Sequence, residues 1–423
     1  MNTFDLSADE KDLIGELENL GVKLSLEQGQ LKVVAPRGAL TPELQERLRR
    51  AKPALIRALE DRDPRPVMEF SLFFFGTESG SGPGEKYRLL LEAARIADEA
   101  GFAGLWTPER HFHDLGGLFP NPAVLAAALA ISTRQLRLRA GSVVLPLQDP
   151  IRVAEEWAVV DNLSAGRVEL SFASGWHAND FALAPDNYFS RHELMYERLE
   201  IVRALWRGEK IRRQSGGAGQ IKVGSFPRPL QPELPLWLTA IGNPESYRRI
   251  GATGAHLLTA LLDQSIEELG QKLPLYHQAL RAAGHDPAAF RTAVFVHTYV
   301  GRDNEAVREL VREPFKAYLA QTLNLLGKLS SSLGLSFDPD GFGEDDKQAL
   351  LDYAFERYFA ERSLMGDSDT CLAQIARLRA VGVQEIACLV DFGLETETVL
   401  AGIRRLGELV RLCRPTAAAA KGS

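Results

Sequence analysis

The chain has 423 residues, with 49 lysines and arginines against 56 aspartates and glutamates and a formal net charge of −7. This length is too great for one small core, so the starting options are a large domain with an accessory piece, or two or three ordinary domains. The content of 45% hydrophobic and 25% charged residues is that of a soluble globular protein, and the spread of basic residues along the chain argues against a nucleic-acid partner.

The N-terminal residues 1–62 are predicted to form a small domain in the order helix, hairpin, helix, helix. Ser7 can cap the first helix, and alternating apolar residues over 22–34 predict the hairpin. Thr41 begins a second helix, and Pro53 predicts a break before a last helical turn. Because so small a core is marginally stable, this domain suits an adaptor better than a catalyst.

A short linker over residues 63–67 is expected to separate this domain from the rest of the chain. The charged stretch 61–66 contains two prolines and no apolar anchor. The second domain is then predicted to span residues 68–413, followed by a flexible tail over 414–423.

The second domain alternates strand-like and helix-like segments, and eight strand–helix units can be counted. This pattern predicts a (β/α)8 barrel with insertions, because the length exceeds that of a minimal barrel. A doubly wound sheet is the alternative, but the glycines at 76–84 lack the spacing of a dinucleotide-binding fingerprint. The insertions are expected at 214–220, with a hairpin over 221–226, and at 327–343. The predicted strands cover residues 68–75, 104–106, 136–144, 167–172, 236–239, 255–259, 293–300 and 385–390.

The three cysteines, Cys371, Cys388 and Cys413, have neither the spacing of a metal site nor the number of a disulfide framework. Cys388 lies in an apolar run and is predicted to be a core thiol. The N-terminus lacks the apolar core of a signal peptide, and nowhere do about 18 apolar residues run together. These features predict a cytoplasmic protein without a membrane span, and no metal site is expected.

A cluster of polar side chains follows the second predicted barrel strand. Trp106, Glu109, Arg110 and His111 lie within six consecutive positions there. Loops at the carboxyl ends of parallel strands form the ligand face of such a fold, so the cluster indicates a site. The alternative is a salt-bridged loop in which Arg110 or His111 only pairs with Glu109.

The loop after the fourth predicted strand, residues 174–180, is a second candidate for the site. Gly175 permits close approach of a ligand, while Trp176, His177 and Asn179 supply a flat apolar surface and hydrogen-bonding groups. Ser174, which begins the loop, is a further candidate for cofactor binding. We expect His177 to lie in the pocket. The alternative is a structural hydrogen bond from His177 to a nearby carbonyl group.

Two further segments contain candidate site residues. Tyr188, Ser190 and Arg191 open a predicted helix, where free backbone N–H groups, a hydroxyl and a guanidinium suit a phosphate; the alternative is an ordinary helix cap. His297 lies within a predicted barrel strand and is a possible substrate contact, although a histidine on a strand is more often a core residue.

The second domain resembles the bacterial luciferase-like flavin monooxygenases over most of residues 67–410. The resemblance rests on the motifs Pro-Glu-Arg-His-Phe at 108–112, Val-Leu-Pro at 144–146, Pro-Ile-Arg-Val-Ala-Glu at 150–155, Asp-Asn-Leu-Ser-Ala-Gly-Arg at 161–167 and Gly-Trp at 175–176. The Gly-Trp-His-Ala-Asn-Asp sequence and the later His-Thr-Tyr-Val-Gly strand resemble the subgroup attached to nonribosomal peptide and polyketide assembly lines.

This resemblance implies a barrel that binds reduced FMN at the mouth and reacts it with O2 to give a C4a-hydroperoxyflavin, which then oxygenates an organic substrate. It also implies a separate flavin reductase and a homodimer. Within the family's pattern, Glu109 matches the carboxylate beneath the flavin and His111 matches a neighbouring histidine. Arg110 stands where luciferase has its key histidine. Ser142 and Val143 match the strand end that lies against the isoalloxazine ring.

Residues 4–60 resemble the N-terminal docking domain of assembly-line subunits, of the type named for the tubulysin system. In that family an exposed hairpin strand and basic residues receive the C-terminal tail of an upstream subunit. The matching features are the hairpin over 22–34 and the basic run Arg47, Arg49, Arg50 and Lys52. The alternative is a hairpin that only packs on its own helices.

Together the two resemblances imply a monooxygenase that acts on a carrier-protein-tethered intermediate, by hydroxylation or by Baeyer–Villiger-type insertion. Two alternatives stay open. The same barrel is used with the deazaflavin F420, in which case hydride transfer would replace oxygen activation. The second alternative is a catalytically inactive scaffold that works only through its docking domain, although polar groups at several strand ends argue against it.

Overall fold

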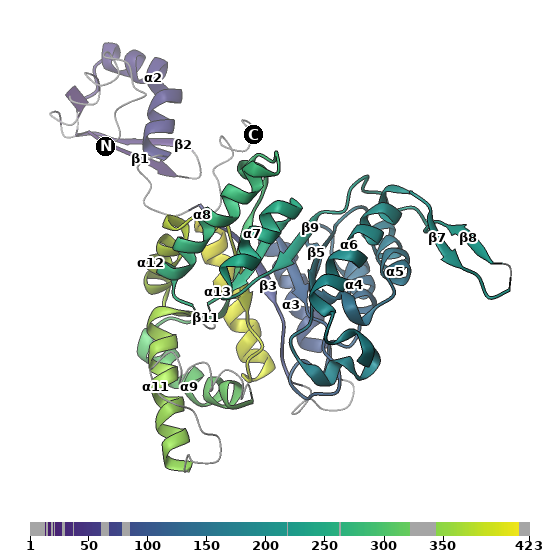
Figure 1. Ribbon diagram of the computed structural model, residues 1–423. Helices are drawn as coiled ribbons and strands as arrows, with labels where there is room; N and C mark the ends of the chain where they lie inside the picture. The colour runs from purple at the N-terminus through teal and green to yellow at the C-terminus, as the bar shows by residue number, and fades with distance from the viewer. Residues whose placement is uncertain are drawn as a thin grey trace. The chain divides into compact units, whose positions relative to one another are not determined.

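The computed structural model describes residues 13, 16–17, 20, 22–27, 30–36, 38–60, 67–77, 85–217, 219–261, 264–321 and 344–413. The chain divides into two compact units, Met1–Val67 with Cys413–Ser423, and Met68–Leu412 (Figure 1). Each unit is described by itself. The predicted linker residues 63–66, the tail 414–423 and the expected insertion at 327–343 lie outside the described residues.

The first unit contains the predicted hairpin. Strands β1 (Lys23–Glu27) and β2 (Gln30–Val34) pair antiparallel, with Leu24 opposite Val33. Helix α2 (Pro42–Glu60) packs on them, and Thr41 Oγ1 accepts a hydrogen bond from Leu44 N at its start (3.2 Å). A small apolar core joins these elements; it comprises Leu13, Leu17, Val22, Leu44, Leu48, Ala51 and Leu55.

The predicted break at Pro53 is wrong, because α2 continues through it to Glu60. Proline removes one backbone hydrogen bond, which discourages a helix interior. Here Leu48 and Ala51 before the proline and Leu55 after it are buried in one core, so packing holds both halves of the helix on one axis. Of the first predicted helix, only Leu13 and residues 16–17 are described as helical.

The second unit is a closed barrel of eight parallel strands, which confirms the (β/α)8 prediction. Neighbouring strands pair in the order β3, β4, β5, β6, β9, β10, β11 and β13, and β13 pairs with β3 to close the sheet. An open doubly wound sheet is thereby excluded. The bounds are β3 (Glu69–Phe73), β4 (Gly104–Thr107), β5 (Arg137–Val144), β6 (Val168–Ala173), β9 (Leu236–Thr239), β10 (His256–Ala260), β11 (Thr292–Val300) and β13 (Glu385–Leu389). The short strand β12 (Leu364–Gly366) extends the sheet beside the end of β11.

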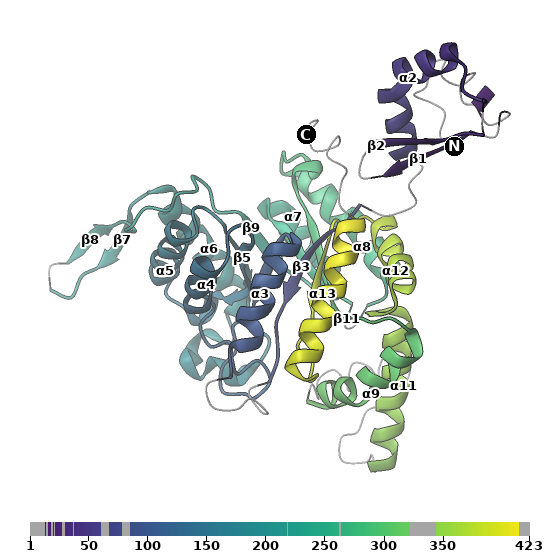
Figure 2. The ribbon, with the colours of Figure 1, turned by 180° about the vertical axis from the view of Figure 1, so that it is seen from behind.

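Helices surround this barrel (Figures 1 and 2), and several begin or end where the sequence supplies a cap. Asn121 caps α4 and Asp149 caps α5 through side-chain acceptors, while Gly101 ends α3 with a φ of 79°. The bounds are α3 (Arg88–Ala100), α4 (Pro122–Ser132), α5 (Pro150–Leu163), α6 (Arg191–Arg207), α7 (Pro244–Thr253), α8 (Ile266–Ala282), α9 (Asn304–Gln321), α11 (Glu344–Glu361), α12 (Ser368–Ala380) and α13 (Thr396–Leu412). None of the helices in the described part of the chain is both long and apolar enough to cross a lipid bilayer.

A hairpin of β7 (Ile211–Gln214) and β8 (Gln220–Val223) projects away from the barrel (Figures 1 and 2). The sequence predicted an inserted hairpin within residues 221–226, and this prediction is wrong, because the two strands of the hairpin lie on either side of the Gly-rich stretch. Residue 220 pairs with 214, and 223 pairs with 211. The Gly-rich stretch is therefore the turn of the hairpin rather than a segment that precedes it.

Paired charges fill the N-terminal half of the barrel interior. Arg139 and Glu169 are 1% exposed and form an ion pair at 2.7 Å, and Arg139 also pairs with Glu385. Glu169 additionally pairs with Arg137 at 2.6 Å and with Arg291 at 3.1 Å. Burial opposes ionisation of Glu169, but Arg139 and its neighbours outweigh it and lower the carboxyl pKa to about 2. We call this set, which also includes Glu69 paired with Arg291, the base network.

Candidate active site

Two loops meet at the C-terminal mouth of the barrel through one buried ion pair. Arg110 follows β4 and Asp180 follows β6; they are 3% and 2% exposed, and Arg110 Nη1 donates to Asp180 Oδ2. The backbone N–H of His111 donates to the other carboxylate oxygen at 3.3 Å. The structure therefore joins the two polar segments that the sequence singled out, through an aspartate to which no role was assigned.

Arg110 is a fixed buried cation. Its guanidinium carbon lies 4.8 Å from the centre of the Trp176 ring, and its Nε has no hydrogen-bond partner among the described residues. A Cβ at Gly116 would lie 2.6 Å from Arg110 Cγ, so this position needs glycine. Burial lowers the pKa of Arg110 and the charge of Asp180 opposes that shift, but an arginine keeps its proton at neutral pH.

Glu109 ties the loop after β4 to the end of β5. It is 3% exposed and accepts hydrogen bonds from Val144 N at 2.6 Å and from the Gln148 side chain. His111 Nε2 lies 3.2 Å from Glu109 Oε1. The sequence left open that Arg110 or His111 only pairs with Glu109. In the structure His111 has this partner, whereas Arg110 pairs with Asp180 and not with Glu109.

His177 contacts a second histidine. Its Nδ1 accepts a hydrogen bond from Asn179 N at 3.3 Å and lies 3.2 Å from His113 Nε2. Because Nδ1 is an acceptor for Asn179, the shared proton between the rings is donated by His113. Burial lowers the pKa of His177, and the charges of His113 and Arg110 lower it further. His177 is therefore neutral at pH 7, with Nδ1 as the acceptor and the ring proton on Nε2.

His113, His177 and Asp180 offer ligand atoms within 4.8 Å of one another, which is the spacing of a metal site. The Asp180 carboxylate, however, is already bound by Arg110. A guanidinium in contact with a carboxylate disfavours a metal cation at the same oxygens. This cluster is better explained as a hydrogen-bonded wall than as a metal centre.

Three hydroxyl groups meet inside the mouth, one from each of three neighbouring strands. Ser142 Oγ lies 2.8 Å from Ser171 Oγ and 2.7 Å from Thr239 Oγ1. The Gly141–Ser142 peptide is cis, and a Cβ at Gly141 would lie 2.9 Å from the Phe73 ring. Val143, beside this cluster in sequence, is 2% exposed. Sequence reasoning found Ser142 and missed Ser171 and Thr239, which inward alternation along β6 and β9 could have indicated.

The predicted phosphate-binding residues lie together at the start of α6. Arg191 donates to Gly175 O at 3.3 Å and to Tyr188 O at 2.7 Å, and its guanidinium carbon is 4.4 Å from the Tyr188 ring centre. Ser190, the N-cap residue, makes no side-chain cap hydrogen bond. First-turn N–H groups and an arginine therefore adjoin the loop after β6, which begins at Ser174.

Two predicted residues are fully buried. Trp106 is 0% exposed, and its indole nitrogen donates to Ser71 Oγ at 2.8 Å, with Arg139 of the base network over its ring. His297 is also 0% exposed and packs among aromatic rings on the β11 side of the barrel. The three possible substrate contacts are thus divided: Trp176 and Asn179 lie beside His177, and His297 belongs to a second cluster.

Comparison with known proteins places this geometry in a family. The family model for luciferase-like monooxygenases matches residues 68–385, and the TubC N-terminal docking domain matches residues 11–61. The chain belongs to the luciferase-like monooxygenases. The expected enzyme class, an oxidoreductase with a docking domain at its N-terminal end, is thereby confirmed.

Relatives of the barrel use more than one flavin-type cofactor. The oxygenase component of a flavin-dependent trigonelline monooxygenase from Acinetobacter baylyi is 25% identical over 80% of this chain and 93% of its own. The oxygenating constituent of 3,6-diketocamphane monooxygenase from Pseudomonas putida, solved with FMN, has a TM-score of 0.66 at 18% identity, covering 81% of this chain and 98% of that one. An F420-dependent secondary alcohol dehydrogenase has a TM-score of 0.60 at 18% identity, covering 82% and 99%. These structural likenesses show the fold and do not decide the cofactor.

Proposed function

We propose that the protein is an FMN-dependent monooxygenase that uses O2 to oxygenate an intermediate tethered to the carrier protein of a nonribosomal peptide or polyketide assembly line. The observation that carries this proposal is the union, in one chain, of a docking domain at 11–61 and a luciferase-like barrel at 68–385. An oxygenase with its own docking domain needs a substrate that is delivered by another protein. Both hydroxylation and Baeyer–Villiger-type insertion fit this arrangement.

The residues at the mouth fit a phosphorylated flavin. Uncapped N–H groups at the start of α6, with Ser190 and Arg191, suit a phosphate, and Gly175 and Tyr188 line the approach to it. We assign the ring-binding surface to Ser142, Val143, Ser174 and Glu109, with Trp106 as its supporting layer. Reduced FMN, when bound, supplies the electrons that activate O2.

The side chains around this surface have distinct chemical roles in the proposal. Arg110, held in place by Asp180, stabilises negative charge that develops in the pocket. His177 is neutral and carries its ring proton on Nε2, the nitrogen that does not contact His113, so it is suited to donate a proton. His111, held by Glu109, is the second candidate for that role. Trp176 covers Arg110 and restricts access of water.

The docking unit supports the proposed partner, an upstream assembly-line subunit or its carrier protein. In its two-stranded sheet each strand keeps one edge without a neighbouring strand among the described residues, and Val34 is 52% exposed. Such an edge accepts an added strand. The side chains of Arg49 and Arg50 on α2 are 79% and 80% exposed, which leaves them accessible to acidic residues of a partner.

A homodimer and a separate flavin reductase are part of the same proposal. Helix α4 is apolar from Pro122 to Ile131, and Val124 and Ile131 on it are 64% and 79% exposed. A surface helix without a polar face is typical of an interface. Sedimentation of the purified protein tests the dimer. The buried thiols of Cys371 and Cys388 suit the reducing conditions of the cytoplasm.

The alternative cofactor is F420, favoured only by the fold likeness to the F420-dependent dehydrogenase. Titration of the protein with FMN and with F420, each in both redox states, separates the two. We expect tight binding of reduced FMN and slower reoxidation of the bound flavin in air than of free flavin. Exclusive binding of F420 would overturn the proposal, and failure to bind either would favour the scaffold.

Charge reversal on the docking helix tests the partner. The double substitution R49E and R50E is expected to reduce turnover of a carrier-bound substrate, without changing flavin affinity. R152E, an exposed arginine on α5 of the barrel, is the matched control. Equal turnover by the docking variant and the control would remove the docking claim.

A further inference from the structure

His113, on the loop after β4, contacts the proposed proton donor His177 on the loop after β6. Its Nε2 lies 3.2 Å from His177 Nδ1, and the ring centres are 4.1 Å apart with the rings edge to face at 69°. Both residues are partly exposed. The two histidines therefore form a pair at the mouth, beside the buried ion pair of Arg110 and Asp180.

His177 alone cannot donate the proton that the proposed function requires of it. At pH 7 its ring is neutral and its one ring proton is on Nε2, because Nδ1 is an acceptor. Loss of that proton without replacement would leave an imidazolate anion, which is much too basic to form near neutral pH. A neutral histidine therefore releases its Nε2 proton only when its Nδ1 gains a proton in the same step.

Two groups donate to His177 Nδ1, and they differ in whether they can release a proton. The backbone N–H of Asn179 lies 3.3 Å away, but an amide N–H does not ionise at neutral pH. The other donor is His113 Nε2, and a protonated imidazole releases a proton in this range. Because both donors occupy Nδ1, water does not reach it, and the replacement proton comes from His113.

The charges around the pair are balanced. Burial lowers the pKa of His177, and among the neighbouring charges His113 and Arg110 lower it further while Asp180 raises it. Arg110 and Asp180 pair with each other, so their effects on the two histidines largely cancel. The Trp176 ring, 5.2 Å from that of His177, covers the pair on one side. His113, which is partly exposed, can take up a proton from water.

We propose that His113 and His177 form a proton relay from solvent to the flavin pocket, in which His113 positions His177 and supplies its proton. This inference rests on the proposed function, in which reduced FMN gives electrons to O2 and a negatively charged oxygen in the pocket takes up a proton. It adds His113, to which the sequence assigned no role, to the residues that serve the reaction.

The relay moves two protons in one step. The Nε2–H bond of protonated His113 breaks and an N–H bond forms at His177 Nδ1, while the Nε2–H bond of His177 breaks and an O–H bond forms in the pocket. The net result is transfer of one proton from His113 to the oxygen, and neither ring gains or loses electrons. Exchange with water restores the starting form of each ring.

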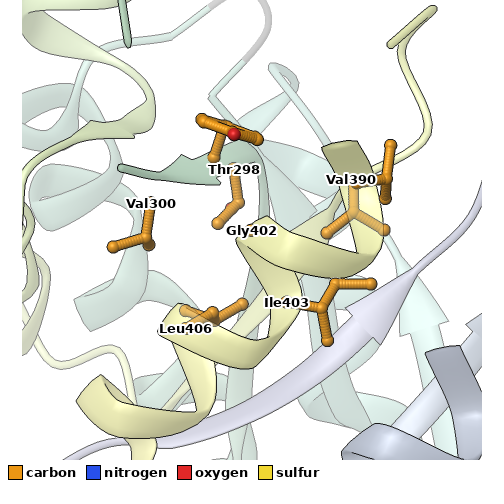
Figure 3. Close-up of a pocket in the computed structure, with 8 residues that line it drawn as sticks. Thr298, Val300, Val390, Gly402, Ile403 and Leu406 are labelled. Atoms are coloured by element: carbon orange, nitrogen blue, oxygen red, sulfur yellow. The ribbon is translucent and has the colours of Figure 1, made fainter. Parts of the chain in front are cut away.

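The pocket drawn in Figure 3 offers no second path for a proton. It lies between the end of β11 and helix α13, and neither a histidine nor a carboxylate lines it. It is a packing space between strand and helix. The residues labelled there are Thr298, Val300, Val390, Gly402, Ile403 and Leu406.

Two variants of His113 separate a relay from a structural hydrogen bond. H113L removes both the hydrogen bond and the proton, whereas H113Q keeps an N–H donor for His177 Nδ1 but has no proton to release. Stopped-flow spectroscopy measures the rate at which protein-bound reduced FMN consumes O2. We expect both variants to be slower than wild type by about a hundredfold, as for loss of a general acid. H277Q, which replaces another partly exposed histidine, on α8, is the matched control and should react like wild type.

The pH profile gives a second readout of the same variants. The wild-type rate should fall as the pH rises, because the relay requires protonated His113, and H113Q and H113L should lose this dependence. A wild-type rate and pH profile in H113Q would make His113 a structural donor only and would overturn the relay.

Solvent isotope effects test the relay in the wild-type protein, whether or not the variants fold. Because two protons move in one step, the rate in mixtures of water and deuterium oxide should depend on the deuterium fraction along a curve. In H113Q the dependence should be linear or absent. A linear dependence in wild type would contradict a two-proton step.

Nuclear magnetic resonance of the flavin-free protein, labelled with ¹⁵N in its histidines, tests the contact independently of the reaction. Loss of the neighbouring charge in H113L and H113Q should raise the pKa of His177, and H277Q should leave it unchanged. An unchanged His177 titration in both His113 variants would overturn the proposal. Failure of the wild-type protein to bind FMN in a parallel titration would instead count against the proposed function, so the two failures are distinguishable.

Discussion

The barrel holds two groups of charges, and they differ in how many oppositely charged partners each charge has. In the base network three arginines, 137, 139 and 291, face three glutamates, 69, 169 and 385. At the mouth, Arg110 has the single partner Asp180, and the Asp391 carboxylate accepts backbone hydrogen bonds from Phe75 and Gly76 but forms no ion pair within the described residues. Buried atoms without a hydrogen-bond partner among the described residues occur in both groups, with Arg139 Nη2 and Glu385 Oε2 in the base network and Arg110 Nε at the mouth. Compensated charge serves the fold, whereas uncompensated charge at the ligand face indicates where ligands bind.

The largest expected effect lies in the base network. Arg139→Met removes the fully buried cation between Glu169 and Glu385, which keep only the partly exposed Arg137 and Arg291 as partners. It should destabilise the barrel by about 3 to 5 kcal/mol, with flavin affinity retained where the protein is folded. Urea unfolding followed by tryptophan fluorescence measures the barrel alone, since all five tryptophans belong to it. Arg152→Met, an exposed ion-pair partner on α5, is the control and should change stability by under about 0.5 kcal/mol. Similar losses of stability in Arg139→Met and Arg152→Met would contradict the view that the base network serves the fold.

Opposite pH dependences should distinguish the two groups. The pKa of Glu169 is lowered to about 2, so its contribution to stability is present above its unfolded pKa and is lost as the pH falls through 2. The free energy of unfolding of wild type should exceed that of Glu169→Gln, and this difference should therefore shrink by about 3 kcal/mol as the pH falls from 4.5 to 2. The pKa of Asp391 is raised to about 7, so its contribution is complete below its unfolded pKa and is lost as the pH rises through 7.

The difference in the free energy of unfolding between wild type and Asp391→Asn should accordingly shrink as the pH rises from about 4 to 7. Free energies of unfolding measured across this range for the two variants provide the check. Parallel pH profiles for the two variants would contradict the distinction between base and mouth.

Substitution of Arg110 should affect catalysis more than folding. Arg110→Gln removes the fixed cation and is expected to lower kcat about a hundredfold, as for the loss of one charge-stabilising donor. Arg110→Lys should restore part of that loss, because it retains the charge opposite Asp180. The measurement is kcat on the carrier-bound substrate beside flavin affinity. A variant with unchanged kcat would make the Arg110–Asp180 pair structural, like the base network.

The smallest expected effect concerns the phosphate site. Arg191→Ala should weaken FMN binding about tenfold but leave riboflavin binding unchanged, because riboflavin lacks the phosphate. Arg203→Ala, further along the same helix, is the matched control. Fluorescence titration with both flavins gives the affinities. An equal loss for riboflavin would assign Arg191 to loop packing with Tyr188 instead.

The sequence predicted the barrel because its signal is local: each of the eight strands is an apolar run followed by a helical pattern. The same local reasoning failed at Pro53, where core contacts of Leu48 and Leu55 outweigh the lost hydrogen bond. It also failed at the β7–β8 hairpin, where the Gly-rich turn decides the pairing.

For the candidate site, the two loops could be predicted but not the contacts between residues. The Arg110–Asp180 pair joins positions 70 residues apart, and Asp391 meets Phe75 across 316 residues. No spacing in the sequence encodes such partners. Asp391 itself directly follows the predicted strand 385–390, so the rule that located Glu109 and His177 at strand ends could have indicated it too.

The most direct test of the proposed function is mass spectrometry of a loaded carrier protein after incubation with this enzyme, photoreduced FMN and isotopically labelled dioxygen. The account predicts that the tethered substrate gains one labelled oxygen atom, and only when enzyme, reduced FMN and dioxygen are all present. A substrate that is reduced or oxidised without gaining labelled oxygen, or that changes only when F420 replaces FMN, would contradict it.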